Sequence, residues 1–204
     1  MKFYSQYEQD KYLYENFFKD VKNGFFVEIG ASDGITFSNS KFFEDLGWEG
    51  ICIEARTNII ECLRKNRKCI VEHACLSSSN DEKEFISVNG YGSGLSGIKD
   101  KCDIKRILEG EGKNSEKEVE IFKCCLINDL LNKYNVKKID YMSIDVEGSE
   151  YDIISTIDFS KFIIDFITVE NNDIKDSSVR YFLTDNGYDI IDRLNIDDVF
   201  RRIT

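Results

Sequence analysis

The run Phe25-Phe26-Val27-Glu28-Ile29-Gly30-Ala31-Ser32-Asp33-Gly34 decides how this chain folds. Its first half predicts a buried strand that ends in an acid, and its second half predicts a turn that contains glycine. Glycine allows the backbone to turn sharply and to approach a ligand where a Cβ atom would collide. The next segment, residues 36–40, offers side chains that cap the start of a helix. A strand, a glycine turn and a helix start in this order predict a nucleotide-cofactor site at the carboxyl end of a parallel sheet.

Strands and helices alternate along the rest of the chain. Further buried strands are predicted at residues 50–54, 69–75, 139–144 and 162–169, with helical patterns between them. This alternation indicates a doubly wound α/β fold with right-handed crossovers. The last two expected strands, at residues 188–191 and 199–203, have no helix between them, which predicts an antiparallel hairpin at the end of the sheet. No linker or internal repeat interrupts the pattern, so we predict one domain over residues 1–204.

The composition is that of a soluble globular protein, with 42% hydrophobic residues and a net charge of −11 over 204 residues. The acidic balance disfavours a general nucleic-acid binder, which would need a basic face. The one dense basic run, residues 64–68, is interpreted as a solvated helix end. The seven cysteines include the pair Cys124-Cys125 and no CxxC motif, which favours reduced thiols over a disulfide framework. Because no signal peptide or membrane-spanning run is visible, we expect a cytoplasmic protein that does not contact membranes.

Acidic residues end four of the expected strands: Glu28, Glu54, Asp145 and Glu170. In an open α/β sheet the carboxyl ends of the strands line the ligand crevice. A single acid at a strand end often marks only the start of solvent, but four acids on one rim indicate a functional site. Glu28 is placed to orient the glycine turn or to meet a cationic amine. Glu54 follows Gly34 at the usual distance for a carboxylate that binds ribose hydroxyls.

The glycine turn differs from that of a dinucleotide site. A dinucleotide-binding turn has the pattern G-x-G-x-x-G, whereas this chain has E-x-G-x-x-x-G, with Glu28 two residues before Gly30. Asp33, within the turn, would repel a phosphate. S-adenosylmethionine (SAM) fits better, because its sulfonium and its amine are cationic and it carries no pyrophosphate.

With these features together, the chain resembles the FkbM-type SAM-dependent methyltransferases. The residues that carry the resemblance occur in the family's order and are Ser5, Gln6, Gln9, Asp10 and the segments 26–34, 38–40, 47–54, 94–97, 139–150 and 168–172. The I-D-x-E-G-x-E block within residues 139–150 makes the resemblance specific. It implies a Rossmann-like class I methyltransferase fold, with a mostly parallel seven-stranded sheet, helices on both faces and an antiparallel terminal strand. It also implies O-methylation of a hydroxyl on a sugar, glycan or other glycoconjugate, beside or fused to a glycosyltransferase.

The resemblance also assigns cofactor contacts. At the methionine end of SAM it places the glycine turn, with Glu28, Gly30, Ser32, Asp33 and Gly34, and at the cofactor carboxylate it places Ser38 and Asn39 of the helix start. The end of the second strand, with Glu54 and Ala55, would contact the ribose. The end of the third strand, with Ala74, Cys75 and Ser77, would lie at the adenine. Gln6 and Gln9 would close over the site, with a solvated helix face as the alternative. Asp145 is expected to contact both the cofactor and the reacting atoms.

A sugar hydroxyl is a poor nucleophile at neutral pH, so it needs a general base or a metal ion. Asp145, Glu170 and Asn171 end neighbouring strands, and by analogy with catechol-type O-methyltransferases their oxygen atoms would bind Mg²⁺ or Mn²⁺. The rival is metal-free catalysis with Asp145 or Glu147 as the base. His73, the only histidine, is a further candidate base; a structural histidine near the cofactor is its alternative.

Two other functions stay open at the level of sequence. One is methylation of another small molecule or of RNA, although the acidic charge disfavours RNA. The other is a SAM-binding interaction module without turnover, against which the four strand-end acids argue. The acceptor itself has no motif in this chain, because acceptor-binding loops vary within one fold.

Overall fold

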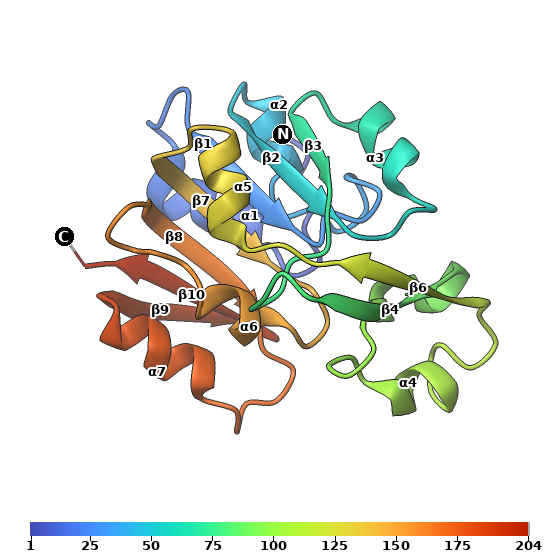
Figure 1. Ribbon diagram of the computed structural model, residues 1–204. Helices are drawn as coiled ribbons and strands as arrows, with labels where there is room; N and C mark the ends of the chain where they lie inside the picture. The colour runs from blue at the N-terminus through green and yellow to red at the C-terminus, as the bar shows by residue number, and fades with distance from the viewer. Residues whose placement is uncertain (204) are drawn as a thin grey trace.

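Seven strands form the main sheet of the computed structural model, which describes residues 1–203 (Figure 1). They are β1 (Phe25–Ile29), β2 (Glu49–Glu54), β3 (Ile70–His73), β7 (Lys138–Ile144), β8 (Ile163–Glu170), β9 (Tyr188–Leu194) and β10 (Asp197–Arg202). Their spatial order is β3-β2-β1-β7-β8-β10-β9. Neighbouring strands are parallel except that β10 runs antiparallel to both β8 and β9. The expected α/β fold, including its antiparallel terminal strand, is therefore confirmed.

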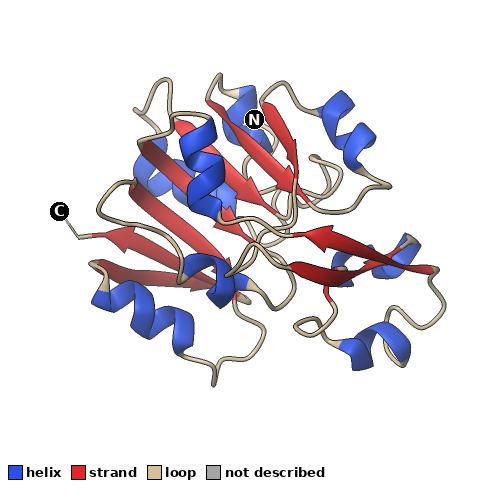
Figure 2. Cartoon of the chain, in the orientation of Figure 1, coloured by secondary structure: helices blue, strands red, loops and turns tan. Residues whose placement is uncertain are grey.

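Helices cover both faces of this sheet (Figure 2). One face carries α1 (Gln9–Leu13), the π-helical turn η1 (Tyr14–Phe18), α2 (Lys41–Asp45) and α3 (Ile60–Asn66), and the other carries α5 (Ile127–Lys133), α6 (Glu150–Ile154) and α7 (Ser178–Asp185). In β1, Phe26 packs into the first layer, whereas Val27 and Ile29 pack into the second. Successive side chains of a strand point to opposite faces, so a strand covered on both sides needs a continuous apolar run.

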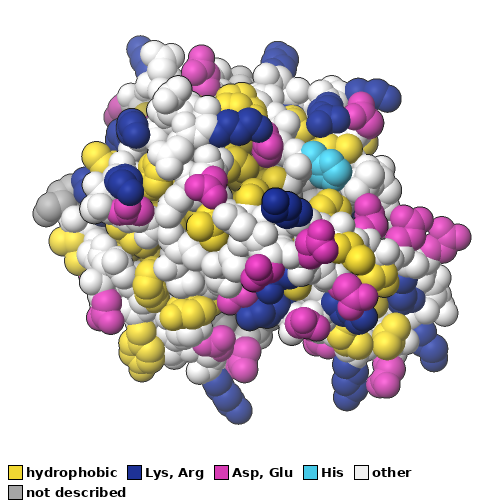
Figure 3. Space-filling view, in the orientation of Figure 1, with side chains coloured by type: hydrophobic (Ala, Val, Ile, Leu, Met, Phe, Trp, Pro, Cys, Tyr) yellow, Lys and Arg dark blue, Asp and Glu magenta, His cyan; other side chains and the backbone are white. Residues whose placement is uncertain are grey.

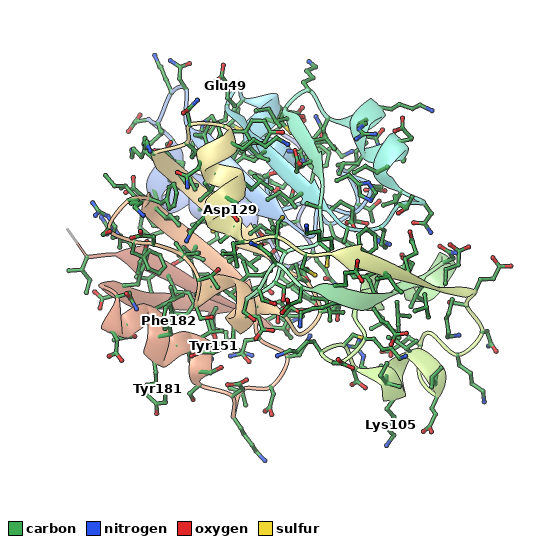
Figure 4. All side chains as sticks on the ribbon, viewed as in Figure 1. Glu49, Lys105, Asp129, Tyr151, Tyr181 and Phe182 are labelled. Carbon is green, nitrogen blue, oxygen red and sulfur yellow. The ribbon has the colours of Figure 1, made fainter. Side chains whose placement is uncertain are left out.

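An aromatic contact joins the two helices that follow β7 and β8. Tyr151 of α6 and Phe182 of α7 pack edge to face, with ring centroids 6.0 Å apart (Figure 4). The neighbouring Tyr181 is exposed to solvent. The contact joins α6 to α7 on the same face of the sheet.

A second, antiparallel sheet lies beside the main one. The alternating patterns of residues 84–88 and 118–124 predict two of its strands, but not that these strands form a sheet of their own. Its strands are β4 (Glu82–Val88), β5 (Gly97–Ile98) and β6 (Lys117–Lys123), in the order β5-β4-β6. The 3₁₀ segment η2 (Gly90–Leu95) and helix α4 (Ile104–Leu108) complete this unit, which we call the insertion. Cys75 and Cys124 pack with Phe85 and Ile98 where the insertion meets the main sheet. In Figure 1 the insertion extends from the arrowhead end of the main strands.

The surface is mixed in charge. Figure 3 shows acidic and basic side chains interspersed over the face in view. Within residues 1–203, the structure contains no helix that is both long enough and apolar enough to cross a membrane.

Candidate functional site

A cavity of about 580 Å³ lies at the carboxyl ends of β1, β2, β7 and β8. Its volume falls within the range of pockets that hold small ligands. Three parts of the chain enclose it: the strand ends below, the insertion through residues 92–98 above, and the N-terminal segment through Gln6 and Tyr7 at one side. A backbone bridge between Ser5 and Phe37 fixes this N-terminal segment beside the glycine turn.

The glycine turn passes so close to β7 that only glycine fits at its start. Gly30 has a φ of +85°, and a Cβ atom there would lie 1.7 Å from the carbonyl oxygen of Asp145. The amides of Gly30 and Ala31 both donate to the carbonyl oxygen of Ile53. The turn therefore joins the ends of β1, β2 and β7, and the cavity opens directly above this junction.

Glu28 lies beneath the glycine turn with its carboxylate fully occupied by protein donors. The hydroxyls of Ser38 and Ser40 and the amide of Asn39 donate to it at 2.7–3.0 Å. Arg67 adds an ion pair at 2.9 Å. Of the two roles expected for Glu28, this geometry supports the orientation of the turn and of the following segment rather than a direct bond to the cofactor amine.

Arg67 is the partner that the sequence did not reveal. It belongs to the basic run expected to be a solvated helix end, yet its side chain is 0% exposed. It contacts Glu28, and its Nε lies 3.2 Å from the carboxylate of Glu44. Burial alone would raise the pKa of Glu44, but the charge of Arg67 and the bonds from Lys41 and the Cys69 amide lower it to about 2. The interpretation of this run as solvated is wrong at Arg67, because α3 packs that residue under β1.

Glu54 ends β2 beside a second buried arginine. Its carboxylate accepts the Ser32 amide at 2.7 Å and the Arg56 amide at 2.9 Å. The Arg56 guanidinium contacts Glu54 and also donates to Ser32 Oγ and to the carbonyl oxygen of Ser93 in the insertion. Arg56 thus ties the second strand end, the glycine turn and the insertion together. We call Glu28, Glu54 and their arginines the cofactor half of the cavity.

Asn39 presents a buried polar atom without a partner among the described residues. Its Nδ2 donates to Ser143 Oγ at 2.9 Å, while its Oδ1 has no hydrogen bond although the side chain is buried at the cavity wall. A buried acceptor of this kind is costly unless a ligand donor satisfies it. An ammonium group fits this acceptor, whereas the expected partner was the cofactor carboxylate.

Three acids meet at the other end of the cavity, which we call the reacting half. Asp145, Glu147 and Glu170 each place a carboxylate oxygen within 4.8 Å of the others. Asp145 is exposed to the cavity, but protein atoms surround that cavity. This burial raises the pKa of Asp145, and the negative charges of Glu170 and Asp197 raise it further. Burial, together with the charge of Asp145, raises the pKa of Glu147 to about 8. Burial, together with the charge of Glu147, raises the pKa of Glu170 to about 8.

Asn171, expected as a metal ligand, turns away from these acids. Its Nδ2 donates to Asp198 at 2.9 Å and to the carbonyl oxygen of Asp176 at 3.3 Å. The prediction is wrong for this residue because the chain leaves the sheet after Glu170. The third oxygen donor is instead Glu147, which the sequence indicated as a base.

The expected site residues divide into two groups. Those that line the cavity are Gln6, Glu28, Gly30, Ser32, Ser38, Asn39, Glu54, Ala55, Ala74, Cys75, Asp145, Glu147 and Glu170. Those that do not line it are Gln9, Asp33, Gly34, Ser77, His73 and Asn171. Proximity in sequence predicted the second group at the site, but these residues lie outside the lining of the cavity.

His73 and Gln9 illustrate this second group. His73 Nε2 lies 2.9 Å from the carbonyl oxygen of Ala55, and its ring packs edge to face on Phe122. Gln9 is buried and donates to Asp197 on β10. Neither side chain reaches the cavity, so the roles of His73 as a base and of Gln9 as a cofactor contact are not supported by their positions.

The insertion contributes a cation to the reacting half. Arg106 of α4 lines the cavity and pairs with Glu111, with 3.2 Å between Nε and the carboxylate. Lys105, its neighbour on α4, points outward (Figure 4). Of the described residues that line the cavity, only Arg56 and Arg106 are arginine or lysine, so a single cation faces the three acids of the reacting half.

A comparison with protein-family models identifies the class of enzyme. A model of the FkbM methyltransferase domain matches residues 28–190. No curated protein matches the chain in sequence. Among solved structures, PH1948 of Pyrococcus horikoshii, a candidate RNA methyltransferase, matches with 12% identity and a TM-score of 0.47 over 97% of this chain and 82% of its own. The glycopeptide N-methyltransferase MtfA, complexed with SAM, matches with 11% identity and a TM-score of 0.45 over 100% and 96%.

Proposed function

The chain belongs to the FkbM methyltransferase family, and from this premise we propose that it transfers the methyl group of SAM to a hydroxyl of a sugar, glycan or glycoconjugate. One observation carries the proposal: Asp145, Glu147 and Glu170 converge in the same cavity as the cofactor half. A hydroxyl must lose its proton as it attacks, and unpaired carboxylates are the groups that accept it.

The cofactor half fits SAM. Glu54 stands where a carboxylate meets the ribose hydroxyls in folds of this class. The unpartnered oxygen of Asn39 suits the amine of the methionine end, and Ala74 and Cys75 line the wall at the end of β3. When bound, SAM supplies an electrophilic methyl group on a cationic sulfur. The chain's task is to hold this end of the cavity rigid, which Glu28 and Arg67 do from below.

We assign the proton acceptor to Asp145. Its carbonyl oxygen lies against Gly30 and its amide donates to the carbonyl oxygen of Ile29, so the backbone of Asp145 adjoins the glycine turn and both line the same cavity. The raised pKa of Asp145 makes it a stronger base than an ordinary carboxylate. Glu147 and Glu170 surround the acceptor hydroxyl and keep it in line with the methyl donor, and such positioning is a large part of catalysis in a displacement reaction.

A divalent cation is the alternative way to activate the hydroxyl. Three carboxylate oxygens within 4.8 Å of one another are the kind of donors that Mg²⁺ and Mn²⁺ prefer. Asp145, Glu147 and Glu170 would hold the ion, which would lower the pKa of the acceptor hydroxyl. Treatment with EDTA followed by Mg²⁺ or Mn²⁺ addition separates the two mechanisms. Activity that EDTA leaves unchanged rules out the metal.

Calorimetry with SAM and S-adenosylhomocysteine tests the cofactor, and transfer of a labelled methyl group to a panel of sugars and glycans tests the acceptor. We expect both cofactor forms to bind and label to enter a sugar at oxygen. Binding without transfer to any small molecule would favour an interaction module. Label on RNA or on an amine would replace the sugar hydroxyl as the acceptor.

A further inference from the structure

The loop that carries Glu147 has an unusual backbone. Glu147 has a φ of +57° and Gly148 a φ of +112°, so two successive residues adopt left-handed conformations. For a residue with a Cβ atom this conformation costs on the order of 1 kcal/mol and persists only where the surroundings enforce it. From this backbone position, a carboxylate oxygen of Glu147 lies within 4.8 Å of oxygens of the other two acids.

The carboxylate of Glu150 enforces this conformation from below. Its oxygens accept the amides of Val146 at 3.1 Å and of Gly148 at 3.0 Å, which lie on either side of Glu147. Glu150 is buried and does not line the cavity. Hydrogen bonds from backbone amides to a charged acceptor are among the stronger ones in proteins, so this carboxylate is a firm anchor for the loop.

The insertion holds the same loop from above. A Cβ atom at Gly97 would lie 3.3 Å from the carbonyl oxygens of Val146 and Glu147, and one at Gly148 would lie 2.5 Å from the carbonyl oxygen of Lys101. The backbone of the insertion thus packs on one side of the loop, and the Glu150 carboxylate lies on the other. If the carboxylate were removed, the backbone at Glu147 would be free to relax on its lower side.

We propose that Glu150 is a positioning residue that acts through Glu147, holding the left-handed loop so that the Glu147 carboxylate stays beside Asp145 and Glu170. The proposal rests on the proposed function in one respect: it takes the three acids to be the reacting group. Glu150 touches neither the cavity nor, by this geometry, the substrate. Its effect on turnover must therefore depend on the presence of Glu147.

A double-mutant cycle tests this dependence. We expect Glu147→Ala and Glu150→Ala each to lower kcat about 100-fold, the loss typical of a catalytic group misplaced by about 1 Å, with SAM affinity within about threefold of wild type. The double variant should match Glu147→Ala within about threefold, because residues that act as a unit are not additive. Glu150→Gln, which keeps one acceptor oxygen, should restore part of kcat. Losses that multiply in the double variant, or SAM affinity that falls with kcat, would overturn the proposal.

Amide hydrogen exchange at Gly148 tests the geometry without turnover. Glu150→Ala should exchange this amide about tenfold faster than wild type, with Glu150→Gln in between. Asp140→Asn is the matched control, because Asp140 accepts the Phe25 amide at the amino end of the strands, away from the cavity. Unchanged exchange in Glu150→Ala would refute the anchor.

If wild type binds SAM but methylates no sugar, the proposed function fails while this exchange result still decides the role of Glu150. If Glu150→Ala does not fold, Glu150→Gln carries both tests.

Discussion

The two halves of the cavity treat their acids in opposite ways. In the cofactor half, Glu28 and Glu54 each contact a buried arginine, and their oxygens accept several hydrogen bonds from the protein. In the reacting half, Asp145, Glu147 and Glu170 face one another instead. The same strand-end position therefore holds an acid neutralised by an arginine in one half and an acid that faces other acids in the other.

Electrostatics explains the difference. A buried carboxylate beside an arginine stays charged, and removing its partner is costly. Carboxylates that share a site raise one another's pKa and destabilise the fold. A protein retains such a cluster where the chemistry needs a strong base or a cation ligand. Substitutions should therefore lower stability in the cofactor half, whereas in the reacting half they should lower turnover without destabilising the fold.

The largest effect is expected from Asp145→Asn. The amide keeps the shape of the side chain but cannot accept the proton of the acceptor, so kcat should fall roughly 10⁴-fold, the upper range for a general base. SAM affinity by calorimetry should stay within a few-fold, because Asp145 belongs to the reacting half. Loss of SAM binding together with kcat would instead place Asp145 in the cofactor half.

The next effect is expected from Arg67→Met, measured as the free energy of unfolding in urea. The substitution leaves Glu28 buried without its cation and Glu44 with Lys41 alone, and breaking a buried pair in this way costs about 3–5 kcal/mol. Arg64→Met is the control, because within residues 1–203 the one ion pair of Arg64 is with Glu61 on the exposed face of α3, and the change should alter stability by less than about 1 kcal/mol. Equal effects of the two variants would contradict the distinction.

The sequence predicted the strands and the rim of acids because those signals are local. Residues 25–29 are apolar except for Glu28 and precede a glycine turn, and β1 spans the same residues. The partners of these acids were not predictable, because they depend on packing between distant segments. Nothing local separates Arg67 from its basic neighbours, yet it lies under Glu28, which is far away in the sequence.

The reacting half shows the same limit. Asn171 follows the β8 acid directly and was expected beside it, but hydrogen bonds to Asp198 and Asp176 draw its side chain away. Glu147 reaches the acids through a left-handed backbone, for which the only local sign is the glycine after it. The identity of strand-end residues is thus predictable, whereas the direction of side chains in the loops beyond them depends on tertiary contacts.

Acid should weaken the support beneath the cofactor half at Glu44, which pairs with Arg67. The pKa of this group is about 2 in the folded protein against an ordinary value of 4.5, so its contribution is fully present above about pH 4.5 and disappears as the pH falls towards 2. The shift corresponds to roughly 3 kcal/mol. The difference in unfolding free energy between wild type and Glu44→Gln, measured in urea from pH 7 to pH 2.5, should shrink by most of this amount. A difference that does not change with pH would show that Arg67 does not hold this carboxylate in its charged form.

The smallest expected effect is a gain in the free energy of unfolding, and it comes from a substitution in the reacting half. Glu170→Gln removes one of three mutually repelling carboxylates and should raise the free energy of unfolding by about 1 kcal/mol, as replacements in strained sites commonly do. Because the pKa of Glu170 is raised to about 8, the wild-type carboxyl is largely protonated at pH 5 and becomes charged as the pH rises through that value. Wild type therefore loses stability towards alkaline pH, and the advantage of the variant should be absent near pH 4.5 and greatest above pH 8.

Glu54→Gln, the matching change in the cofactor half, should lower stability, because Glu54 binds the Ser32 amide and Arg56. If both variants shift stability in the same direction, the two halves do not differ in the way that their hydrogen bonds and ion pairs indicate.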